Sequence, residues 1–209
     1  MKLAPEGYPF IALFAAATVI VFFAFGMPPA VVPLCLTIFM LNFFRDPDRN
    51  VPRGKGAFTS PADGKVMVIR DVYEGKYLQA DVKEIGIFMS PLNVHVNRAP
   101  CDGRVKMVKH NKGRFSAAYK DEASVSNENI EMVLATEYGD VLVRQVAGFV
   151  ARRAVCRKKE GDMLRRGERY GIIKFSSRVD LYIPGNTNIR VKPGEMVKAG
   201  ETIIGEIED

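Results

Sequence analysis

Two different hydropathy patterns divide the chain near residue 45. Residues 10–44 are almost entirely apolar, and no charged residue stands between Glu6 and Arg45. The remainder is polar and basic, with short apolar runs. We therefore expect an N-terminal membrane anchor over residues 1–45 and a β-rich domain over residues 46–209.

The apolar segment is interrupted once, at Gly26-Met27-Pro28-Pro29. The runs on either side, residues 10–25 and 30–44, are each shorter than the roughly 20 residues that a straight transmembrane helix needs. A helical hairpin in one leaflet, or two short tilted spans, fits these lengths and places both ends on one side. The basic residues that follow are Arg45, Arg49, Arg53 and Lys55. The positive-inside bias then predicts that both flanks of the hairpin and the β-rich domain lie on the cytoplasmic face of the cell membrane.

The rest of the chain has the pattern of an all-β protein. Alternating runs separated by Gly, Pro, Asn and Asp cover residues 65–72, 82–89, 131–136, 141–146 and 170–174. Such spacing is typical of a sandwich or barrel. Residues 60–66 and 189–200 resemble the two half-motifs of a biotinyl/lipoyl-type barrel-sandwich, although the carrier lysine between two methionines is absent. We expect a mostly β barrel-sandwich domain that is not a swinging-arm carrier.

Charge and cysteine usage narrow the classes of partner. The net charge is +6 and basic residues concentrate in residues 151–170, which favours an anionic partner. This basic segment lacks the interleaved aromatic residues and the recognition-helix pattern that would indicate nucleic-acid binding. A membrane surface is therefore the better candidate partner. The alternative is that the segment is a solvated charged loop without a partner. The three cysteines and two histidines lack metal-ligand spacing, so we expect no metal site and a reducing compartment.

The strongest chemical signal is the serine pair in residues 174–180, Lys-Phe-Ser-Ser-Arg-Val-Asp. A serine hydroxyl that attacks the carbonyl just before it forms an ester, and elimination from that ester leaves a dehydroalanine that hydrolyses to a pyruvoyl group. The chain would then build an electrophilic cofactor from itself. Most serine pairs are solvated turn residues, so this interpretation needs support from other segments.

A second candidate is His95, which follows an apolar run. A lone histidine in that position is usually a structural hydrogen-bonding group. Here its neighbours Asn93, Asn97 and Arg98 are polar rather than core residues, and Asp63 supplies a carboxylate in an Asp-Gly turn. Dispersed Asp, His and Ser residues can converge into a catalytic site.

Five segments in order resemble phosphatidylserine decarboxylase of the short bacterial and archaeal-type branch. They are residues 43–47, 60–64, 93–98, 147–153 and 169–180. Five co-linear motifs are far more specific than any one of them, and the chain length agrees with this branch. The resemblance implies a proenzyme that cleaves itself between Ser176 and Ser177 into a β chain (1–176) and an α chain (177–209).

The same resemblance implies the cofactor and the partners. A pyruvoyl group derived from Ser177 condenses with the amine of phosphatidylserine and serves as electron sink for loss of the carboxylate, releasing phosphatidylethanolamine without metal or PLP. The implied partners are phosphatidylserine, the bilayer, the two chains of one precursor and a second copy in a homodimer. Nucleic acid is not among them.

Roles for single residues follow from matching positions. Asp63 matches the family's Asp-Gly acid, which with a histidine activates the serine. His95 is the expected histidine for self-cleavage and the proton donor in decarboxylation. Longer enzymes carry a second histidine where this chain has Arg98, so either His95 performs both tasks or Asn97 and Arg98 share them.

Basic and amide side chains are candidates for binding the substrate, since arginine binds phosphate and carboxylate groups bidentately. The candidates are Asn97, Arg98, Arg152, Arg153 and Arg178. For the arginines at positions 152, 153 and 178, the alternative role is ion pairing with Glu131, Glu137 or Asp180.

Position 176 departs from the family, which usually has glycine there. Glycine tolerates the backbone twist that brings the hydroxyl onto the preceding carbonyl, whereas Ser176 carries a Cβ. Other pyruvoyl-dependent decarboxylases cleave between two serines, so the chain either cleaves or is an arrested proenzyme. Two further alternatives are a non-enzymatic membrane adaptor on a biotinyl/lipoyl-like domain and a decarboxylase for a related serine lipid or a soluble amino acid.

Overall fold

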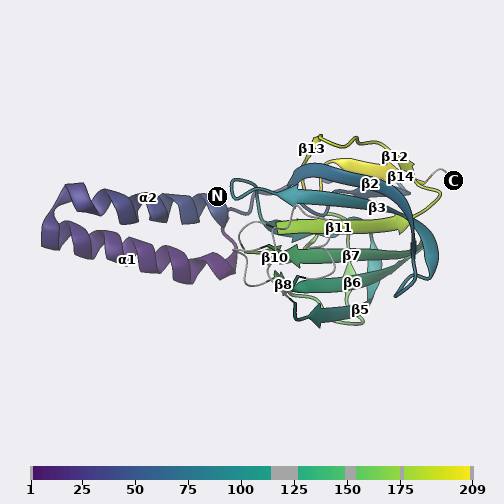
Figure 1. The fold of residues 1–209 in the computed structure, drawn as a ribbon, viewed down its shortest axis with the longest axis horizontal. Coiled ribbons are helices and arrows are strands. Elements are labelled where there is room, and N and C mark those ends of the chain that lie inside the picture. The colour runs from purple at the N-terminus through teal and green to yellow at the C-terminus, as the bar shows by residue number, and fades with distance from the viewer. Residues whose placement is uncertain (1, 114–126, 149–153, 175–176, 208–209) are drawn as a thin grey trace. The chain divides into compact units, whose positions relative to one another are not determined.

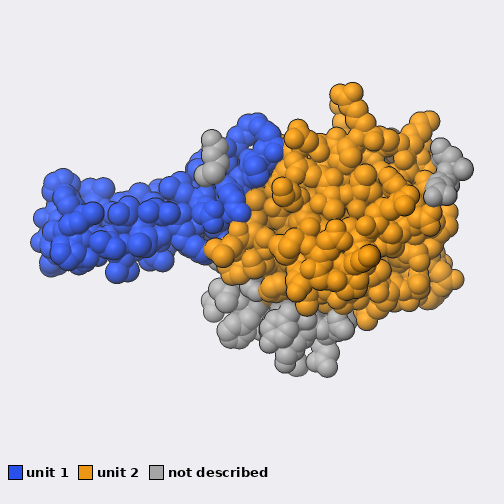
Figure 2. All heavy atoms as spheres, turned by 90° about the horizontal axis from the view of Figure 1, so that it is seen from above, with its two compact units in different colours: residues 1–48 blue, residues 49–209 orange. Residues whose placement is uncertain are grey.

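The computed structural model describes residues 2–113, 127–148, 154–174 and 177–207. The chain forms two compact units, residues 1–48 and residues 49–209 (Figure 2). Three residues singled out in the sequence, Arg152, Arg153 and Ser176, lie outside the described residues.

The first unit is a hairpin of two apolar helices (Figure 1). A 3₁₀ turn, η1 (Pro5–Gly7), leads into α1 (Tyr8–Phe25), and α2 (Met27–Phe43) returns antiparallel to it. The break between the helices is narrower than the sequence indicated, because both prolines fall in the first turn of α2, where a missing N–H costs nothing. Gly26 alone makes the turn, at a φ of 82° that favours glycine.

The hairpin exposes its apolar side chains. Residues Pro5–Phe25 form the one helical stretch in the described chain that is long and apolar enough to cross a membrane, and α2 is shorter. Phe23 is 82% exposed. The two hydroxyls in the pair, Thr18 and Thr37, approach each other at 3.4 Å, and each also donates to a carbonyl of its own helix. Both threonine hydroxyls thus have hydrogen-bond partners within the hairpin, as a lipid environment requires.

The second unit consists of strands and loops throughout its described part. The strands are β1 (Ala57–Thr59), β2 (Gly64–Glu74), β3 (Ala80–Met89), β4 (Val96–Arg98), β5 (Gly103–Asn111), β6 (Asn129–Thr136), β7 (Gly139–Ala147), β8 (Ala154–Cys156), β9 (Met163–Leu164), β10 (Arg169–Ile173), β11 (Ser177–Pro184), β12 (Asn188–Ile189), β13 (Met196–Val197) and β14 (Ile203–Glu206). The predicted runs correspond to β2, β3, β6, β7 and β10. The expected mostly β fold with an N-terminal helical hairpin is confirmed.

Eight strands form a curled antiparallel sheet in the order β13-β2-β3-β11-β7-β6-β5-β9 (Figure 1). Two three-stranded sheets, β1-β14-β12 and β4-β10-β8, complete the unit. β11 lies between β3 and β7, so Ser177 pairs with Met89 on one side and Ala147 on the other. A strand paired along both edges has little freedom to change register.

Alternation along β11 separates two environments. Val179, Leu181 and Ile183 belong to the main hydrophobic core, and Ser177 has the same parity. The residues between them, including Arg178 and Asp180, point to the other face of the sheet and are equally buried. The first residue of β11 is therefore placed at the edge of a packed core.

Candidate active site

Ser177 is fully buried at the start of β11. Its Oγ donates to the Met89 sulfur at 3.4 Å, and the Asn97 side-chain amide donates to the same sulfur at 3.8 Å. The side-chain amide of Gln145, on β7, donates to the side-chain oxygen Oδ1 of Asn97 at 2.8 Å. Sulfur is a weak acceptor, so the hydroxyl of Ser177 is held only loosely. The structure thus brings two of the predicted site residues, Ser177 and Asn97, around one thioether.

His95 is also fully buried, immediately before β4. Its Nδ1 lies 2.9 Å from the Asn93 carbonyl. A carbonyl can only accept, so Nδ1 carries a hydrogen, and whenever the ring is neutral the lone pair is on Nε2. The Asn93 side chain accepts from both the N–H and the hydroxyl of Ser90 at 2.8 Å, which fixes this loop. The ring is therefore presented in one tautomer, with Nε2 as its basic atom.

The backbone of His95 is tied to the chain that leads into the serine pair. Its carbonyl accepts from Ile173 N at 3.3 Å, at the end of β10. Next along the chain, β4 pairs with β10 through Val96 and Ile172. Residues 95 and 96 therefore lie beside Ile172 and Ile173 of β10, a few residues before Ser177 in the sequence.

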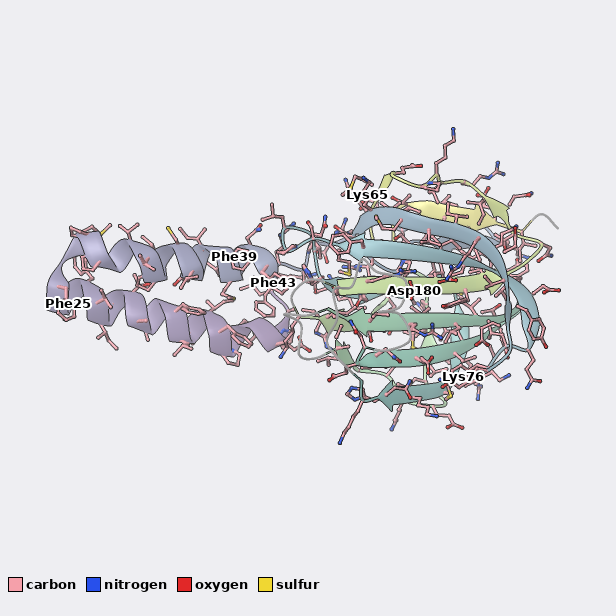
Figure 3. The ribbon with its side chains drawn as sticks, in the orientation of Figure 1. Phe25, Phe39, Phe43, Lys65, Lys76 and Asp180 are labelled. Atoms are coloured by element: carbon pink, nitrogen blue, oxygen red, sulfur yellow. The ribbon has the colours of Figure 1, made fainter. Side chains whose placement is uncertain are left out.

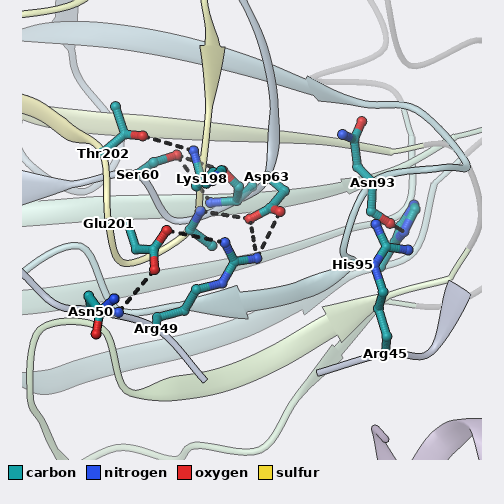
Figure 4. A network of polar contacts seen from close by, with 12 residues as sticks. Arg45, Arg49, Asn50, Ser60, Asp63, Asn93, His95, Lys198, Glu201 and Thr202 are labelled. Atoms are coloured by element: carbon teal, nitrogen blue, oxygen red, sulfur yellow. Dashed lines mark hydrogen bonds and ion pairs between the residues drawn. The ribbon is translucent and has the colours of Figure 1, made fainter. Parts of the chain in front are cut away.

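Asp63 forms its hydrogen bonds with Arg49 and Ala199 rather than with His95 or Ser177 (Figure 4). Arg49 Nη2 lies 3.0 and 2.8 Å from the two carboxylate oxygens, and the Ala199 N–H donates at 2.8 Å. The Arg49 and Asp63 side chains are only 6% and 13% exposed. Arg49 also lies 3.6 Å from Glu201. The carboxylate is thus held in a nearly buried ion pair, and its described hydrogen bonds go to neither His95 nor Ser177. The convergence of Asp63, His95 and Ser177 stays a prediction.

The loop of Asp63 nevertheless joins two other segments of the site through its backbone. The Arg98 N–H donates to the Pro61 carbonyl at 2.9 Å. Ser60 accepts from Gly200 and donates to Thr202, both at 2.8 Å. This loop therefore lies between β4 and the C-terminal segment of the chain.

Two of the four arginines predicted to bind the substrate are described, and both contact other groups of the protein. Arg98 is buried and donates to the Gly167 carbonyl at 2.9 Å. Arg178 is ion-paired with Asp180 and lies 3.5 Å from Glu84. The pairing of Arg178 with Asp180 is the structural alternative that the sequence left open for it.

Arg178 belongs to a cluster of charged groups and tyrosines, some buried and some half-exposed, on the face of the sheet opposite Ser177. Its members are Arg70, Lys76, Tyr77, Glu84, Glu131, Arg144, Arg178, Asp180 and Tyr182. Burial alone raises the pKa of the Glu131 carboxyl, but bonds from Lys76 and Tyr77 and the charge of Arg144 bring that pKa below its ordinary value. A strand that alternates apolar residues with arginine, aspartate and tyrosine is the signal that could have revealed this cluster.

A pocket of about 440 Å³ lies away from these residues. It is lined by residues 54–58, 101–104 and 135–138, with Met163 and Arg166, and includes none of the predicted site residues. Burial raises the pKa of its Cys101 thiol to about 12, so that thiol stays protonated and unreactive at neutral pH. We therefore do not assign chemistry to this pocket. Among the described residues, no group of three or more His, Cys, Asp and Glu side chains is placed to hold a metal ion.

The Arg49–Asp63 pair gives a first testable prediction. Replacing Arg49 by methionine leaves a buried carboxylate with only the Ala199 N–H, which we expect to lower the free energy of unfolding by about 3 kcal/mol. The exposed pair Arg190–Glu206 is the matched control, because Arg190→Met should cost less than about 1 kcal/mol. Denaturant unfolding of both full-length variants in detergent measures the difference, and equal losses would show that Asp63 does not depend on Arg49.

Comparison with known proteins supplies the family. Residues 36–205 match the family model described as phosphatidylserine decarboxylase. Proteins named phosphatidylserine decarboxylase proenzyme are similar over almost their whole length. The relative from Syntrophus aciditrophicus is 42% identical over 97% of this chain and 96% of its own. Those from Syntrophotalea carbinolica and Aromatoleum aromaticum are each 45% identical, over 96% and 98% of this chain and 94% and 95% of theirs. The chain therefore belongs to the phosphatidylserine decarboxylase family, a family of decarboxylases, as its five motifs predicted.

Proposed function

We propose that this chain decarboxylates phosphatidylserine to phosphatidylethanolamine, using a pyruvoyl group that it makes from Ser177. The observation that carries the proposal is the burial of Ser177 at the first position of the central strand, with the segment of His95 beside the chain that precedes it. The names of the relatives, which contain the word proenzyme, support a precursor that is processed.

The proposed maturation uses only atoms of the chain and water. The Ser177 hydroxyl attacks the carbonyl carbon of residue 176, the peptide C–N bond breaks, and an ester with a free amine results. Removal of the Cα proton then breaks the Cβ–O bond and releases the carboxylate of residue 176. The remaining dehydroalanine takes up water and loses ammonia, which leaves a keto group. Burial of Ser177 favours this route, because bulk water that would hydrolyse the ester is kept away.

The described residues fit such a group, since Ser177 faces a packed core and its hydroxyl makes only a weak bond to sulfur. When formed, the pyruvoyl group supplies a keto carbonyl that takes up the electrons left when the substrate loses its carboxylate. His95 holds its proton at Nδ1 against the Asn93 carbonyl and offers Nε2 for general acid–base work. Asn97 orients the thioether that contacts Ser177.

Asp63 has a structural task that the described contacts support. It joins Arg49, from the proposed β chain, to the Ala199 N–H of the proposed α chain. Its part in activating Ser177, which the family resemblance implies, stays a prediction. So do substrate binding by Arg98, Arg152, Arg153 and Arg178 and the formation of a homodimer.

The hairpin of α1 and α2 is proposed to anchor the enzyme in the cell membrane, with the β domain on the cytoplasmic face. Its exposed apolar side chains and internally satisfied hydroxyls support this placement. An anchor of this kind holds the β domain at the lipid headgroups, which favours a lipid substrate over a soluble amino acid.

Intact-mass spectrometry of the full chain in detergent, with and without hydroxylamine, tests the proposal. We expect two fragments, residues 1–176 and 177–209, the smaller beginning with a keto group that reacts with hydroxylamine. A single full-length mass would contradict the proposal for this sequence. The variant Ser176→Gly then separates the alternatives: cleavage of that variant indicates an arrested proenzyme, and no cleavage indicates a non-enzymatic membrane adaptor.

A further inference from the structure

Arg178 stands directly after the proposed cleavage site and is one of the most deeply buried charges in the described chain. It is 1% exposed, on the face of β11 opposite Ser177. Its Nε donates to Asp180, two residues along the same strand face, and its Nη2 lies 3.5 Å from Glu84 on β3. Figure 3 shows Asp180 near the middle of the sheet. A charge is stable at such depth only when it is paired, so these contacts fix the position of the guanidinium.

The neighbouring strand leaves room for this side chain. Gly86 on β3 pairs with Asp180, and a Cβ at Gly86 would lie 2.6 Å from Arg178 Nη2. Glu84, two residues earlier on β3, also accepts from Arg70 at 2.7 Å. The guanidinium therefore lies against the backbone of β3 at Gly86, and a side chain at that position would displace it. We call these contacts of Arg178 with Asp180, Glu84 and Gly86 its seat. The seat opposes a sliding motion of β11, which would also move the backbone of Ser177.

We propose that Arg178, seated on Asp180, Glu84 and Gly86, is a positioning residue that keeps residue 177 in register once it becomes the first residue of a chain. The inference rests on the proposed self-cleavage. Chain ends usually fray, because nothing continues the backbone beyond them. A reacting group displaced by about 1 Å can lose about 100-fold in rate. The pairing of β11 with β3 and β7 holds the backbone of residue 177, and Arg178 adds a side-chain anchor directly behind it.

The seat has a chemical consequence during maturation. The ester formed by Ser177 has two fates: elimination, which transfers the Cα proton to a base and leads to the keto group, or hydrolysis, which consumes one water and leaves serine as the first residue. Elimination needs the Cα–H bond aligned with the Cβ–O bond, whereas hydrolysis needs only access of water. A loosened residue 177 should therefore shift the products from pyruvoyl to serine.

The test compares four full-length proteins in detergent: wild type, Arg178→Met, Arg178→Lys and the control Arg70→Met. Arg70 pairs with the same Glu84 but is half exposed and remote from the cleaved bond. Mass spectrometry gives the fraction of α chains that begin with pyruvoyl and with serine. For molecules that carry pyruvoyl, kcat and KM are measured on phosphatidylserine in mixed micelles, and thermal unfolding reports on overall stability.

For Arg178→Met we expect a fraction of α chains that begin with serine and a fall in kcat of about 10-fold to 100-fold at unchanged KM. Arg178→Lys should recover part of both, and Arg70→Met should match the wild type. A raised KM with normal kcat would instead identify Arg178 as a substrate ligand and overturn the inference, as would wild-type products from Arg178→Met. If Arg178→Met does not fold, Asp180→Asn, which keeps the size of the partner but removes its charge, is judged by the same readouts. An uncleaved wild type contradicts the proposed function itself, and the inference with it.

Discussion

Replacing Ser177 by alanine is expected to leave the chain at full length and to reduce decarboxylase activity to background. The variant has neither the nucleophile for cleavage nor the atoms from which the keto group is made. Folding should be almost unaffected, because the hydroxyl makes only one described contact, a bond to the Met89 sulfur, and removing it should change the free energy of unfolding by less than about 1 kcal/mol. Gel electrophoresis and intact mass distinguish the full-length product.

The comparison variant for this experiment is Ser176→Gly, which keeps the Ser177 nucleophile and removes the Cβ before it. We expect that variant to be cleaved at least as completely as the wild type, because glycine adopts the required backbone twist more easily. Cleavage between residues 176 and 177 in Ser177→Ala would show that another group attacks this bond and would overturn the assignment of Ser177.

Replacing His95 by glutamine should lower the rate of decarboxylation by about 100-fold to 10,000-fold, the usual contribution of general acid–base catalysis. Glutamine has a similar volume, so the buried site should not collapse, but it cannot take up or release a proton near neutral pH. The matched control is His110→Gln, since His110 is exposed on β5 and its ion-pair partner among the described residues is Glu128. Normal turnover by His95→Gln would exclude His95 as the proton donor.

The same variant resolves whether one histidine serves both reactions. If His95→Gln is cleaved normally but decarboxylates slowly, His95 acts only on the substrate. If it remains uncleaved, His95 serves self-cleavage, and the loss of decarboxylation then follows from the missing pyruvoyl group. If it is partly cleaved, the turnover per cleaved molecule shows whether His95 also acts on the substrate. Cleavage is followed by the mass of the fragments over time, and decarboxylation by release of carbon dioxide, so the two effects are measured separately.

Local sequence patterns were sufficient for much of the fold but not for its central strand. β2, β3, β6, β7 and β10 were visible because apolar and polar residues alternate along them. β11 is not among the runs that the local pattern predicts. Serine pairs such as the one at its start are typical of solvated turns, and the burial of Arg178 depends on Glu84 of β3. In the hairpin, Pro28 and Pro29 suggested a long break, although proline is well tolerated in a first helical turn.

The candidate site was predicted in part, for similar reasons. Ser177, His95 and Asp63 were found from motifs, but nothing in the sequence shows that Asp63 binds Arg49 and Ala199 instead of His95. That arrangement depends on how the C-terminal segment folds back onto residues 60–63. The role of Met89 as the contact of Ser177 depends on the register between β3 and β11, which no local pattern specifies.

The place of β11 in the sheet would also make the proposed maturation a one-way event. The proposed α chain contributes the strand between β3 and β7, and β13 and β14 pair with β2 and β1 of the proposed β chain. Within the proposed α chain only β12 and β14 pair with each other among the described strands, and β11 and β13 pair with strands of the proposed β chain. These strands must therefore be placed while the polypeptide is still continuous. After the cut, the unfolded pieces no longer share a covalent link that would bring them together. The native structure would then persist through slow unfolding rather than through the ability to refold.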